Sequence, residues 1–310
     1  MSTVAVEGLQ KSYGSLKAVD GISFEVKKGE VFSLLGPNGA GKTTTIEILE
    51  GLRERDGGNV AVLGMDPWKK GYDLHKKIGV IPQGFRFLDY PTPREAIRYY
   101  SALFGTKVDP DELLKRVILE DAGNQYFMRL SGGQKQKVGL ALSLVNDPEM
   151  VFLDEPTTGL DPAARRAMWD VIRNLKKEGR SVLLTTHYLE EAEELADRVA
   201  IMNFGKIIAM GTPTQIIAKH GSGESLTVHS EKKLAEYIKE NSHLKAEWAT
   251  NGVVTIHLEQ KNDVMIAMGI IQESGIPWHL LSTKRDSLED IFVRMVGEGS
   301  STQGEASEKK

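Results

Sequence analysis

The nine residues from Gly36 to Thr44 read Gly-Pro-Asn-Gly-Ala-Gly-Lys-Thr-Thr, which is the spacing of a phosphate-binding loop. The apolar run 31–35 before the loop predicts a buried strand, and the apolar periodicity of residues 45–52 after it predicts a helix. The start of such a helix carries unpaired backbone N–H groups and a partial positive charge. The sequence therefore predicts a nucleoside triphosphate site rather than a glycine-rich turn before an ordinary helix.

The residue types within this loop predict how it holds the nucleotide. Glycine lets the backbone come close to phosphate oxygens, lysine places an ammonium on the β- and γ-phosphates, and the threonine hydroxyl after it ligates Mg²⁺. The residues expected to contact the nucleotide are Gly36, Asn38, Gly39, Ala40, Gly41, Lys42, Thr43 and Thr44.

Asp154 and Glu155 directly follow the apolar run 150–153, which predicts another buried strand. Phosphoryl transfer to water needs one carboxylate on Mg²⁺ and a second that polarises the attacking water. Ligand sites in α/β sheets lie at the carboxyl ends of strands, where the phosphate loop also opens. This placement favours a catalytic pair over a pair of solvated carboxylates.

A second helix start that could bind an anion occurs in Leu130-Ser-Gly-Gly-Gln134, ahead of an expected helix over residues 134–145. Taken alone, Ser131 and the two glycines are explained as a plain N-cap. A chain with one phosphate loop needs a second phosphate clamp only if two chains share their sites.

Four further polar residues each allow two interpretations. Tyr13 lies on a turn and could stack on a nucleobase or be a surface tyrosine. Gln83 and His187 each follow a predicted strand, and could reach the metal, a water or the γ-phosphate, or be ordinary polar residues at a strand end. Asp161 caps a helix that begins at Pro162, and a contact across a dimer would be an additional role.

The composition restricts the class of protein. The chain has 310 residues, 40% of them hydrophobic and 26% charged, so two globular domains are expected. No apolar stretch is long enough to span a membrane and the N-terminus is no signal peptide, so we expect any work at a membrane to depend on another chain. Cysteine is absent, which excludes disulfides and thiol catalysis, and the net charge of −4 argues against a nucleic-acid partner.

The order of predicted elements gives the fold class. Residues 3–30 alternate apolar and polar side chains and predict a small antiparallel sheet, and residues 85–147 form a helical insertion that includes a helix over 111–122. After the linker at Gly221, the pattern β-α-β-β-α-β predicts a ferredoxin-like module, followed by a helix at 288–296. The expected fold is α/β: a P-loop NTPase core with an antiparallel β subdomain and a helical insertion, plus a small α+β domain.

The predicted domains follow from these patterns. We expect a nucleotide-binding domain over residues 1–220, an accessory domain over 221–297 and a disordered tail over 298–310. The accessory module contains no catalytic cluster, so packing or a regulatory dimer contact is its expected role.

These motifs together resemble those of the ATP-binding subunit of an ABC transporter. Gly36–Thr43 is similar to its Walker A loop, Val151–Glu155 to its Walker B strand, and Leu130–Gln134 is identical to its signature LSGGQ. Gln83, Thr158–Asp161, His187 and Tyr13 fall where the family has its Q-loop, D-loop, H-switch and adenine-stacking aromatic. The resemblance covers residues 3–220, and residues 287–292 resemble the C-terminal end of drug-exporter ATPases of the ABC-2 type.

The resemblance implies that two copies pack head to tail, with ATP and Mg²⁺ as cofactors. Each site would then combine residues of one chain with the signature helix of its partner. The implied catalytic residues are Glu155, His187, Lys42 and Gln83; the implied metal ligands are Thr43, Gln83 and Asp154; and the implied ATP contacts from the partner copy are Ser131, Gly132, Gly133 and Gln134, with Asp161 nearby.

The resemblance also implies a cytoplasmic ATPase, peripheral on the inner face of the cell membrane, that drives a separate transmembrane permease. The permease would be held near residues 83–100, and the transport would be export. An ATP-switched regulatory module acting on a non-transport partner is the alternative. The lack of a second cassette argues against two-cassette translation factors, and the lack of long heptads argues against SMC-type DNA ATPases.

Overall fold

The computed structural model describes residues 2–221, 224–258, 260 and 262–296. The chain divides at Pro213/Thr214 into two units, which are described separately. The predicted tail 298–310 lies outside the described residues, and the predicted domain limits at residue 220 stay a prediction.

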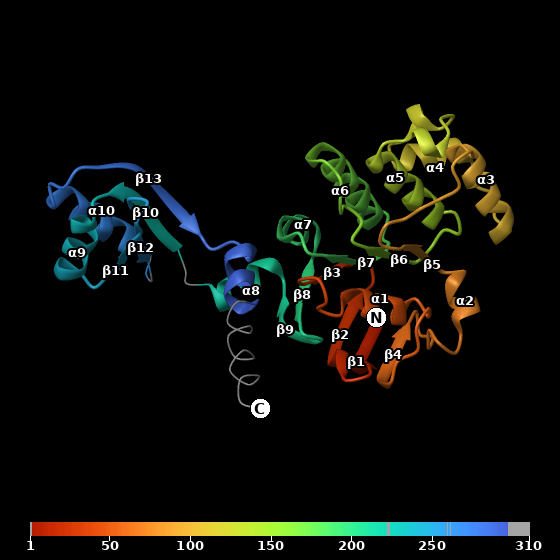
Figure 1. Ribbon diagram of the computed structural model, residues 1–310, viewed down its shortest axis with the longest axis horizontal. Helices are drawn as coiled ribbons and strands as arrows, with labels where there is room; N and C mark the ends of the chain where they lie inside the picture. Colours follow the sequence, from red (N-terminus) through yellow and green to blue (C-terminus); the bar gives the residue numbers. More distant parts are fainter. Residues whose placement is uncertain (1, 222–223, 259, 261, 297–310) are drawn as a thin grey trace. The chain divides into compact units, whose positions relative to one another are not determined.

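A six-stranded sheet forms the centre of the first unit, with strand order β5-β6-β7-β3-β8-β9; β9 is antiparallel to β8, and the other pairs are parallel. In Figure 1 helices α3 to α6 lie on one side of this sheet, and α1 with the antiparallel strands lies on the other. In chain order the elements are β1 (Ser2–Tyr13), β2 (Leu16–Lys27), β3 (Val31–Leu35), α1 (Lys42–Leu49), β4 (Gly57–Val62), α2 (Gly71–His75), β5 (Ile78–Ile81), α3 (Pro93–Phe104), α4 (Pro110–Arg116), the 3₁₀ turns η1 (Glu120–Ala122) and η2 (Phe127–Arg129), α5 (Gly132–Ser143), β6 (Met150–Asp154), α6 (Pro162–Lys177), β7 (Ser181–Thr186), α7 (Leu189–Leu195), β8 (Arg198–Asn203) and β9 (Lys206–Gly211).

The central strands β3, β6 and β7 are buried on both faces, as their near-continuous apolar sequences predict. Because successive side chains of a strand point to opposite faces, β6 contributes to two cores. Val151 and Leu153 pack with the helices α3 to α6, whereas Met150 and Phe152 pack with α1 and the antiparallel strands.

The predicted antiparallel sheet is present with the order β2-β1-β4, and its third strand, β4, follows α1 in the chain. In the helical region, α3 begins at a reciprocal capping box between Thr92 and Glu95. The single helix expected over 111–122 was wrong. The helix α4 ends at Arg116, since Ile118 has a positive φ of 56°, and only the short turn η1 follows.

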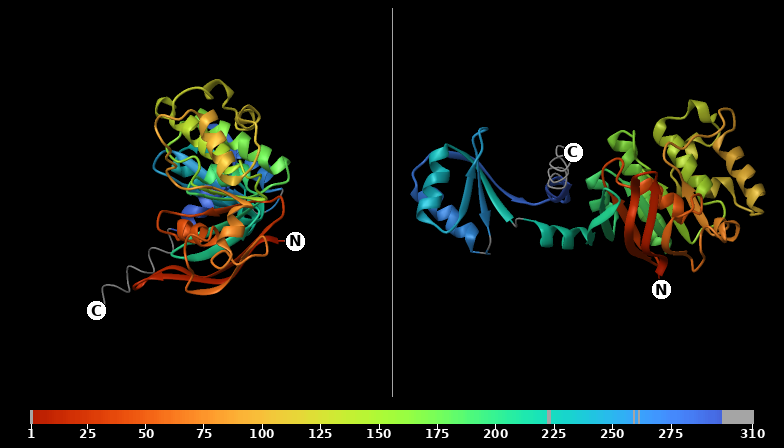
Figure 2. Two further views of the ribbon diagram at one scale, coloured as in Figure 1. Left: turned by 90° about the vertical axis from the view of Figure 1, so that its right-hand side faces the viewer. Right: turned by 60° about the horizontal axis from the view of Figure 1, so that its bottom comes forward.

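The second unit has a ferredoxin-like arrangement, which confirms the predicted fold class. Its sheet has the order β11-β12-β10-β13 with antiparallel neighbours, and its core contains Leu226, Val228 and Ile256. Figure 2 shows α9 and α10 on one face of this sheet. The elements are α8 (Pro213–His220), which begins at the border, β10 (Glu224–Ser230), α9 (Lys232–Asn241), β11 (Lys245–Trp248), β12 (Val253–Leu258), α10 (Asp263–Glu273), β13 (Trp278–Arg285) and a helix over residues 288–296.

Within the described residues, every helix is too short or too polar to cross a membrane.

Candidate functional site

The phosphate loop connects the buried strand β3 to α1, and the packing around it requires glycine at two positions. A Cβ added at Gly36 would lie 2.4 Å from the carbonyl oxygen of Met202, and one at Gly41 would lie 2.2 Å from that of Ala18. Gly41 is also the N-cap of α1, with a positive φ of 101° that side chains rarely adopt. The loop is therefore pressed against β8 and β2, with its glycines as the contact points.

A cavity of about 460 Å³ opens over this loop and is large enough for a nucleotide. Tyr13, which is 41% exposed, forms part of its wall. The cavity is lined by Tyr13, Leu16, Ala18, Asn38, Gly39, Gly41, Lys42, Thr43, Thr44, Gln83 and Glu155.

Lys42 is buried at the floor of the cavity. Its ammonium donates to the carbonyl oxygens of Gly36 (2.9 Å) and Pro37 (3.1 Å) and lies 3.4 Å from Glu155 Oε1. Burial lowers the pKa of Lys42, and the charge of Glu155 acts in the opposite direction. The ammonium thus lies at the N-terminal end of α1, where a phosphate would also gain from the helix dipole.

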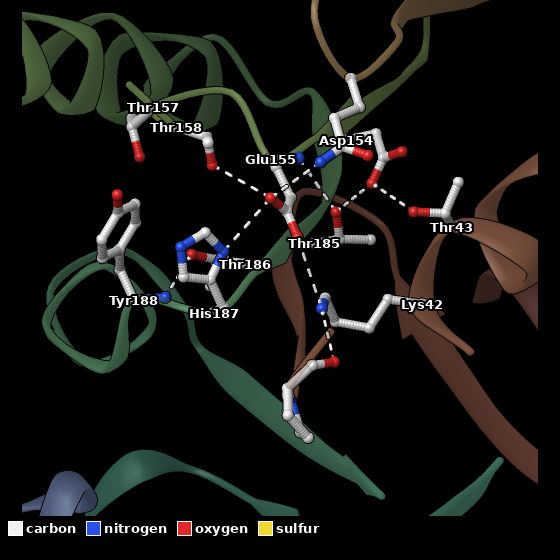
Figure 3. Close-up of polar contacts among 12 residues, drawn as sticks. Lys42, Thr43, Asp154, Glu155, Thr157, Thr158, Thr185, Thr186, His187 and Tyr188 are labelled. Carbon is white, nitrogen blue, oxygen red and sulfur yellow. Dashed lines mark hydrogen bonds and ion pairs between the residues drawn. The ribbon is translucent and has the colours of Figure 1, made fainter. Parts of the chain in front are cut away.

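The strand β6 brings Asp154 to the loop, and Thr43 Oγ1 donates to Asp154 Oδ1 at 3.4 Å. The hydroxyl of Thr185 donates to the same carboxylate oxygen (Figure 3). Burial raises the pKa of Asp154, while the two hydroxyls act to lower it.

The donor set around Thr43 fits Mg²⁺. A hydroxyl and a carboxylate are hard oxygen ligands, and Mg²⁺ is commonly held by one or two such groups together with substrate phosphates. The described residues contain no group of three or more acidic, histidine or cysteine side chains that could hold a metal on its own. The protein ligands would therefore supply only part of a metal shell, and a triphosphate would supply the rest.

Glu155 receives polar contacts from three directions (Figure 3). Its Oε2 accepts hydrogen bonds from Gln83 Nε2 and Thr158 Oγ1, both at 3.1 Å, and lies 3.2 Å from His187 Nδ1. Burial would raise the pKa of Glu155, but the charge of Lys42, the Thr158 hydroxyl and His187 outweigh it and hold the pKa below its ordinary value. The carboxylate is therefore ionised near neutral pH and able to accept a proton.

The backbone of Glu155 is in the left-handed region, with φ of 49°. Such a conformation is strained for a residue other than glycine, and strain of this kind clusters at functional sites. The N–H of Glu155 donates to Thr185 Oγ1 at 3.0 Å, so β7 fixes the point at which the chain turns away from β6.

The structure separates the signature residues from this cavity. Ser131 caps α5 in a reciprocal capping box with Gln134, and these two residues and Gly133 line a different hollow of about 210 Å³ beside α6. Ser131 and Gly132 are exposed to solvent. Asp161 caps α6, accepting from the N–H groups of Ala163 (3.0 Å) and Ala164 (2.9 Å). Within the described chain, none of these residues lines the loop cavity.

Sequence reasoning missed two hydroxyls that hold the carboxylates. Thr185 binds both Asp154 and the backbone of Glu155, and Thr158 binds the Glu155 side chain. A polar residue near the end of the apolar strand β7 was the available signal. It could not show which carboxylate the hydroxyl would meet, since that depends on the pairing of β6 with β7.

Arg53 was also missed. Its guanidinium lies 5.3 Å from the centre of the Tyr13 ring, and its Nε donates to Glu47 Oε2 at 2.6 Å. Because Glu47 belongs to α1, this cation–π contact ties the tyrosine to the phosphate-loop helix.

The comparisons with known proteins agree with this site. A family model described as ABC transporter matches residues 19–158. The daunorubicin resistance ATP-binding protein DrrA3 of Streptomyces coeruleorubidus is 35% identical, with 96% of each chain covered. A Nod factor export ATP-binding protein I of Rhizobium sp. (strain N33) is 36% identical, covering 96% of this chain and 98% of the relative.

Solved structures point to the same class. A structure titled as the ATP-binding subunit of an ABC transporter is 29% identical, with a TM-score of 0.64 and coverage of 71% of this chain and 94% of that one. A structure of the ATP-binding cassette MJ1267 in its ADP conformation is 28% identical, with a TM-score of 0.61 over 69% of this chain and 92% of that one.

The fold, the loop site and these likenesses define an ATP-binding cassette. The chain belongs to the ATP-binding subunits of ABC transporters. It is an ATPase subunit that powers transport, as the sequence predicted, and its likeness to exporter ATPases extends through the second unit.

Proposed function

We propose that this chain hydrolyses ATP as a head-to-tail homodimer on the cytoplasmic face of the cell membrane and thereby drives export by a separate permease. The observation that carries the proposal is a cluster of charged and polar side chains at the cavity above the phosphate loop. Lys42 and Glu155 line the cavity, Asp154 contacts Thr43 in its wall, and His187 contacts Glu155. The names of the relatives, a drug resistance protein and Nod factor export proteins, support export as the direction.

In the proposed reaction, the backbone of residues 36–44 and Lys42 hold the phosphates, and Tyr13 stacks on the adenine. Thr43 and Asp154, with Gln83 beside them, would hold Mg²⁺, which neutralises phosphate charge when bound. Glu155 accepts a proton from the water that attacks the γ-phosphorus, because its carboxylate is ionised and is not one of the proposed metal ligands. His187 hydrogen-bonds a γ-phosphate oxygen and stabilises the charge that develops there.

The signature residues act in the second copy's site under this proposal. Ser131, Gly132 and Gly133 present a helix start to solvent and lie outside their own chain's nucleotide cavity. Donors of this kind stabilise the transition state by about 3–4 kcal/mol each when water is excluded. A similar structure, 25% identical with a TM-score of 0.59, is titled as a dimeric post-hydrolysis state of the cassette MJ0796 bound to ADP and Pi.

The permease would bind a groove of about 470 Å³ beside the Gln83 turn. Gly84, Phe85 and Arg86 line it together with Tyr100 and Phe104 of α3. The same segment of the chain, residues 84–104, also exposes large apolar side chains, with Tyr90, Tyr99 and Leu103 all more than 60% exposed. An apolar patch of this kind on a charged chain suits a protein partner.

The catalytic part of the proposal is tested with Glu155→Gln. This variant should bind ATP and form a stable dimer in size-exclusion chromatography while its turnover falls by roughly 10³-fold, because the amide accepts no proton. Glu190→Gln, an exposed glutamate of α7, is the control and should match the parent. Parental turnover by Glu155→Gln would contradict the role given to Glu155.

The partner is tested by purification from detergent-solubilised membranes. A polytopic chain should co-purify with the parent, and Leu103→Glu should lose it while retaining ATP binding. Met265→Glu, which alters an equally exposed apolar residue in the second unit, is the control. Recovery of no membrane chain with the parent would favour the regulatory alternative.

A further inference from the structure

A buried carboxylate that the proposed reaction does not use lies on α7. Glu191 is completely buried, and its Oε1 accepts hydrogen bonds from Thr157 Oγ1 at 2.8 Å and from Trp169 Nε1 at 3.0 Å. Burying a carboxylate is unfavourable, and a packed apolar side chain of similar size would serve a purely structural position as well or better. Its presence therefore indicates a role that depends on its oxygen atoms.

The three hydrogen-bonded residues come from three different elements. Thr157 lies in the loop that leads from β6 to α6, Trp169 lies in α6, and Glu191 lies in α7, four residues after His187. Burial raises the pKa of Glu191, while its hydrogen-bond donors and the charge of Arg165 in α6 act to lower it. The Arg165 guanidinium also lies 4.2 Å from the centre of the Tyr188 ring. The cluster thus joins the segment that follows Glu155 to the segment that follows His187.

Two consecutive residues of the β6–α6 loop contact two different acidic side chains. Thr158 donates to Glu155 Oε2, while Thr157 donates to Glu191 Oε1. Fixing Thr157 therefore restricts the backbone that places the Thr158 hydroxyl on Glu155. On the other side, the first turn of α7 follows Tyr188, whose ring lies 4.2 Å from that of His187.

We propose that Glu191 is a positioning residue for ATP hydrolysis: its carboxylate anchors Thr157 and so sets the geometry between Glu155 and His187. The inference depends on the proposed role of Glu155 as the group that accepts the proton. Because Glu191 and Thr157 do not line the nucleotide cavity, the anchor acts on the rate of the chemical step and leaves ATP affinity unchanged.

The expected effects separate this role from simple packing. Glu191→Ala and Thr157→Val each remove the anchoring hydrogen bond, and each should lower kcat by about 10–100-fold with KM within about twofold of the parent, since small displacements of catalytic groups have effects of this size. Glu191→Gln retains an oxygen that can accept from both donors, and should keep kcat within about threefold of the parent. The double variant should lose no more than either single variant, because both remove one interaction.

The experiment measures kcat, KM and melting temperature for these variants at a protein concentration that saturates the dimer. Rates are expressed per bound nucleotide, so that a misfolded fraction does not count as slow enzyme. Trp169→Phe retains an aromatic ring but removes the indole N–H, and should lower kcat less than Thr157→Val. Glu193→Gln, an exposed residue of the same helix, is the matched control.

Parental kcat per bound nucleotide in Glu191→Ala would overturn the proposal. So would a double variant whose fold-decrease in kcat equals the product of the decreases in the two single variants. A loss in Trp169→Phe as large as that in Thr157→Val would also overturn it, since packing alone would then explain the effect. Failure of the underlying function has a different signature, because Glu155→Gln itself would then turn over at the parental rate. If Glu155→Gln is inactive and Glu191→Ala is not, only the anchoring role is wrong.

Discussion

The two units differ in the number of ionisable side chains that they bury. In the first unit Lys42, Asp154, Glu155 and Glu191 are buried, and each contacts another polar group of the site or the loops that carry it. Among the described residues of the second unit, the buried polar residue is Asp263, which accepts from Gln260 N and His243 Nε2 at the start of α10. The first unit also buries Glu30 and Glu50, to which the proposed reaction gives no part. Because burying charge is unfavourable, we expect the chemistry where several such groups contact one another, around Glu155.

The largest expected effect tests this contrast directly. Lys42→Met removes the ammonium that would bind the phosphates, and ATP turnover should fall by roughly 10³-fold. The second unit should keep its melting behaviour, followed by hydrogen exchange of the amides of β10 and β12. A variant that hydrolyses ATP normally would show that the buried lysine is structural.

A substitution in the core of the second unit should lower its stability and leave ATP hydrolysis unaltered. Leu226→Ala removes a completely buried side chain from the core of the second unit, and should lower that unit's free energy of unfolding by about 3 kcal/mol. ATPase activity at 25 °C, measured without the permease, should stay within about twofold of the parent. A large loss of activity would mean that the second unit contributes to hydrolysis.

Glu50 is a buried acidic residue of the first unit that has no part in the proposed reaction. Burial, with Asp154 and Glu47 nearby, raises the pKa of this C-cap of α1 to about 8. The folded chain therefore holds a proton that the unfolded chain releases above pH 4.5, so this residue makes the free energy of unfolding fall as the pH rises from about 4.5 to 8. Glu50→Gln should remove that fall, and its stability advantage over the parent should grow by about 2 kcal/mol between pH 5 and pH 7.

The measurement is urea unfolding of both proteins at the two pH values. An advantage that does not change with pH would show that Glu50 is ionised in the folded chain.

The smallest effect concerns the wall of the nucleotide cavity. Tyr13→Ala removes the proposed adenine stack, and should weaken ATP binding by about 1 kcal/mol, a factor of about five, with kcat little changed. Tyr13→Phe, which retains the ring, should bind ATP like the parent in isothermal titration calorimetry. Equal affinities for all three proteins would place the base elsewhere.

Local motifs were predictable because their geometry depends on neighbouring residues. The loop Gly36–Thr44, the cap of α5 and the carboxylates at the end of β6 are each specified within a few positions of the chain. The end of α4 was not, since the left-handed conformation of Ile118 carries no glycine signal. The ferredoxin-like order of the second unit followed from its alternation of elements, and its pairing agrees with that order.

The amino-acid sequence by itself determined that a triphosphate loop, a carboxylate pair and a second helix start with a Ser-Gly-Gly cap exist in one chain. Only the tertiary structure decided which of them meet. Thr185 reaches Asp154 because the register of parallel strands pairs these two positions across 31 residues of chain. Thr157 reaches Glu191 because α6 and α7 pack together. Contacts between distant segments depend on strand pairing and helix packing, and these are properties of the whole folded chain.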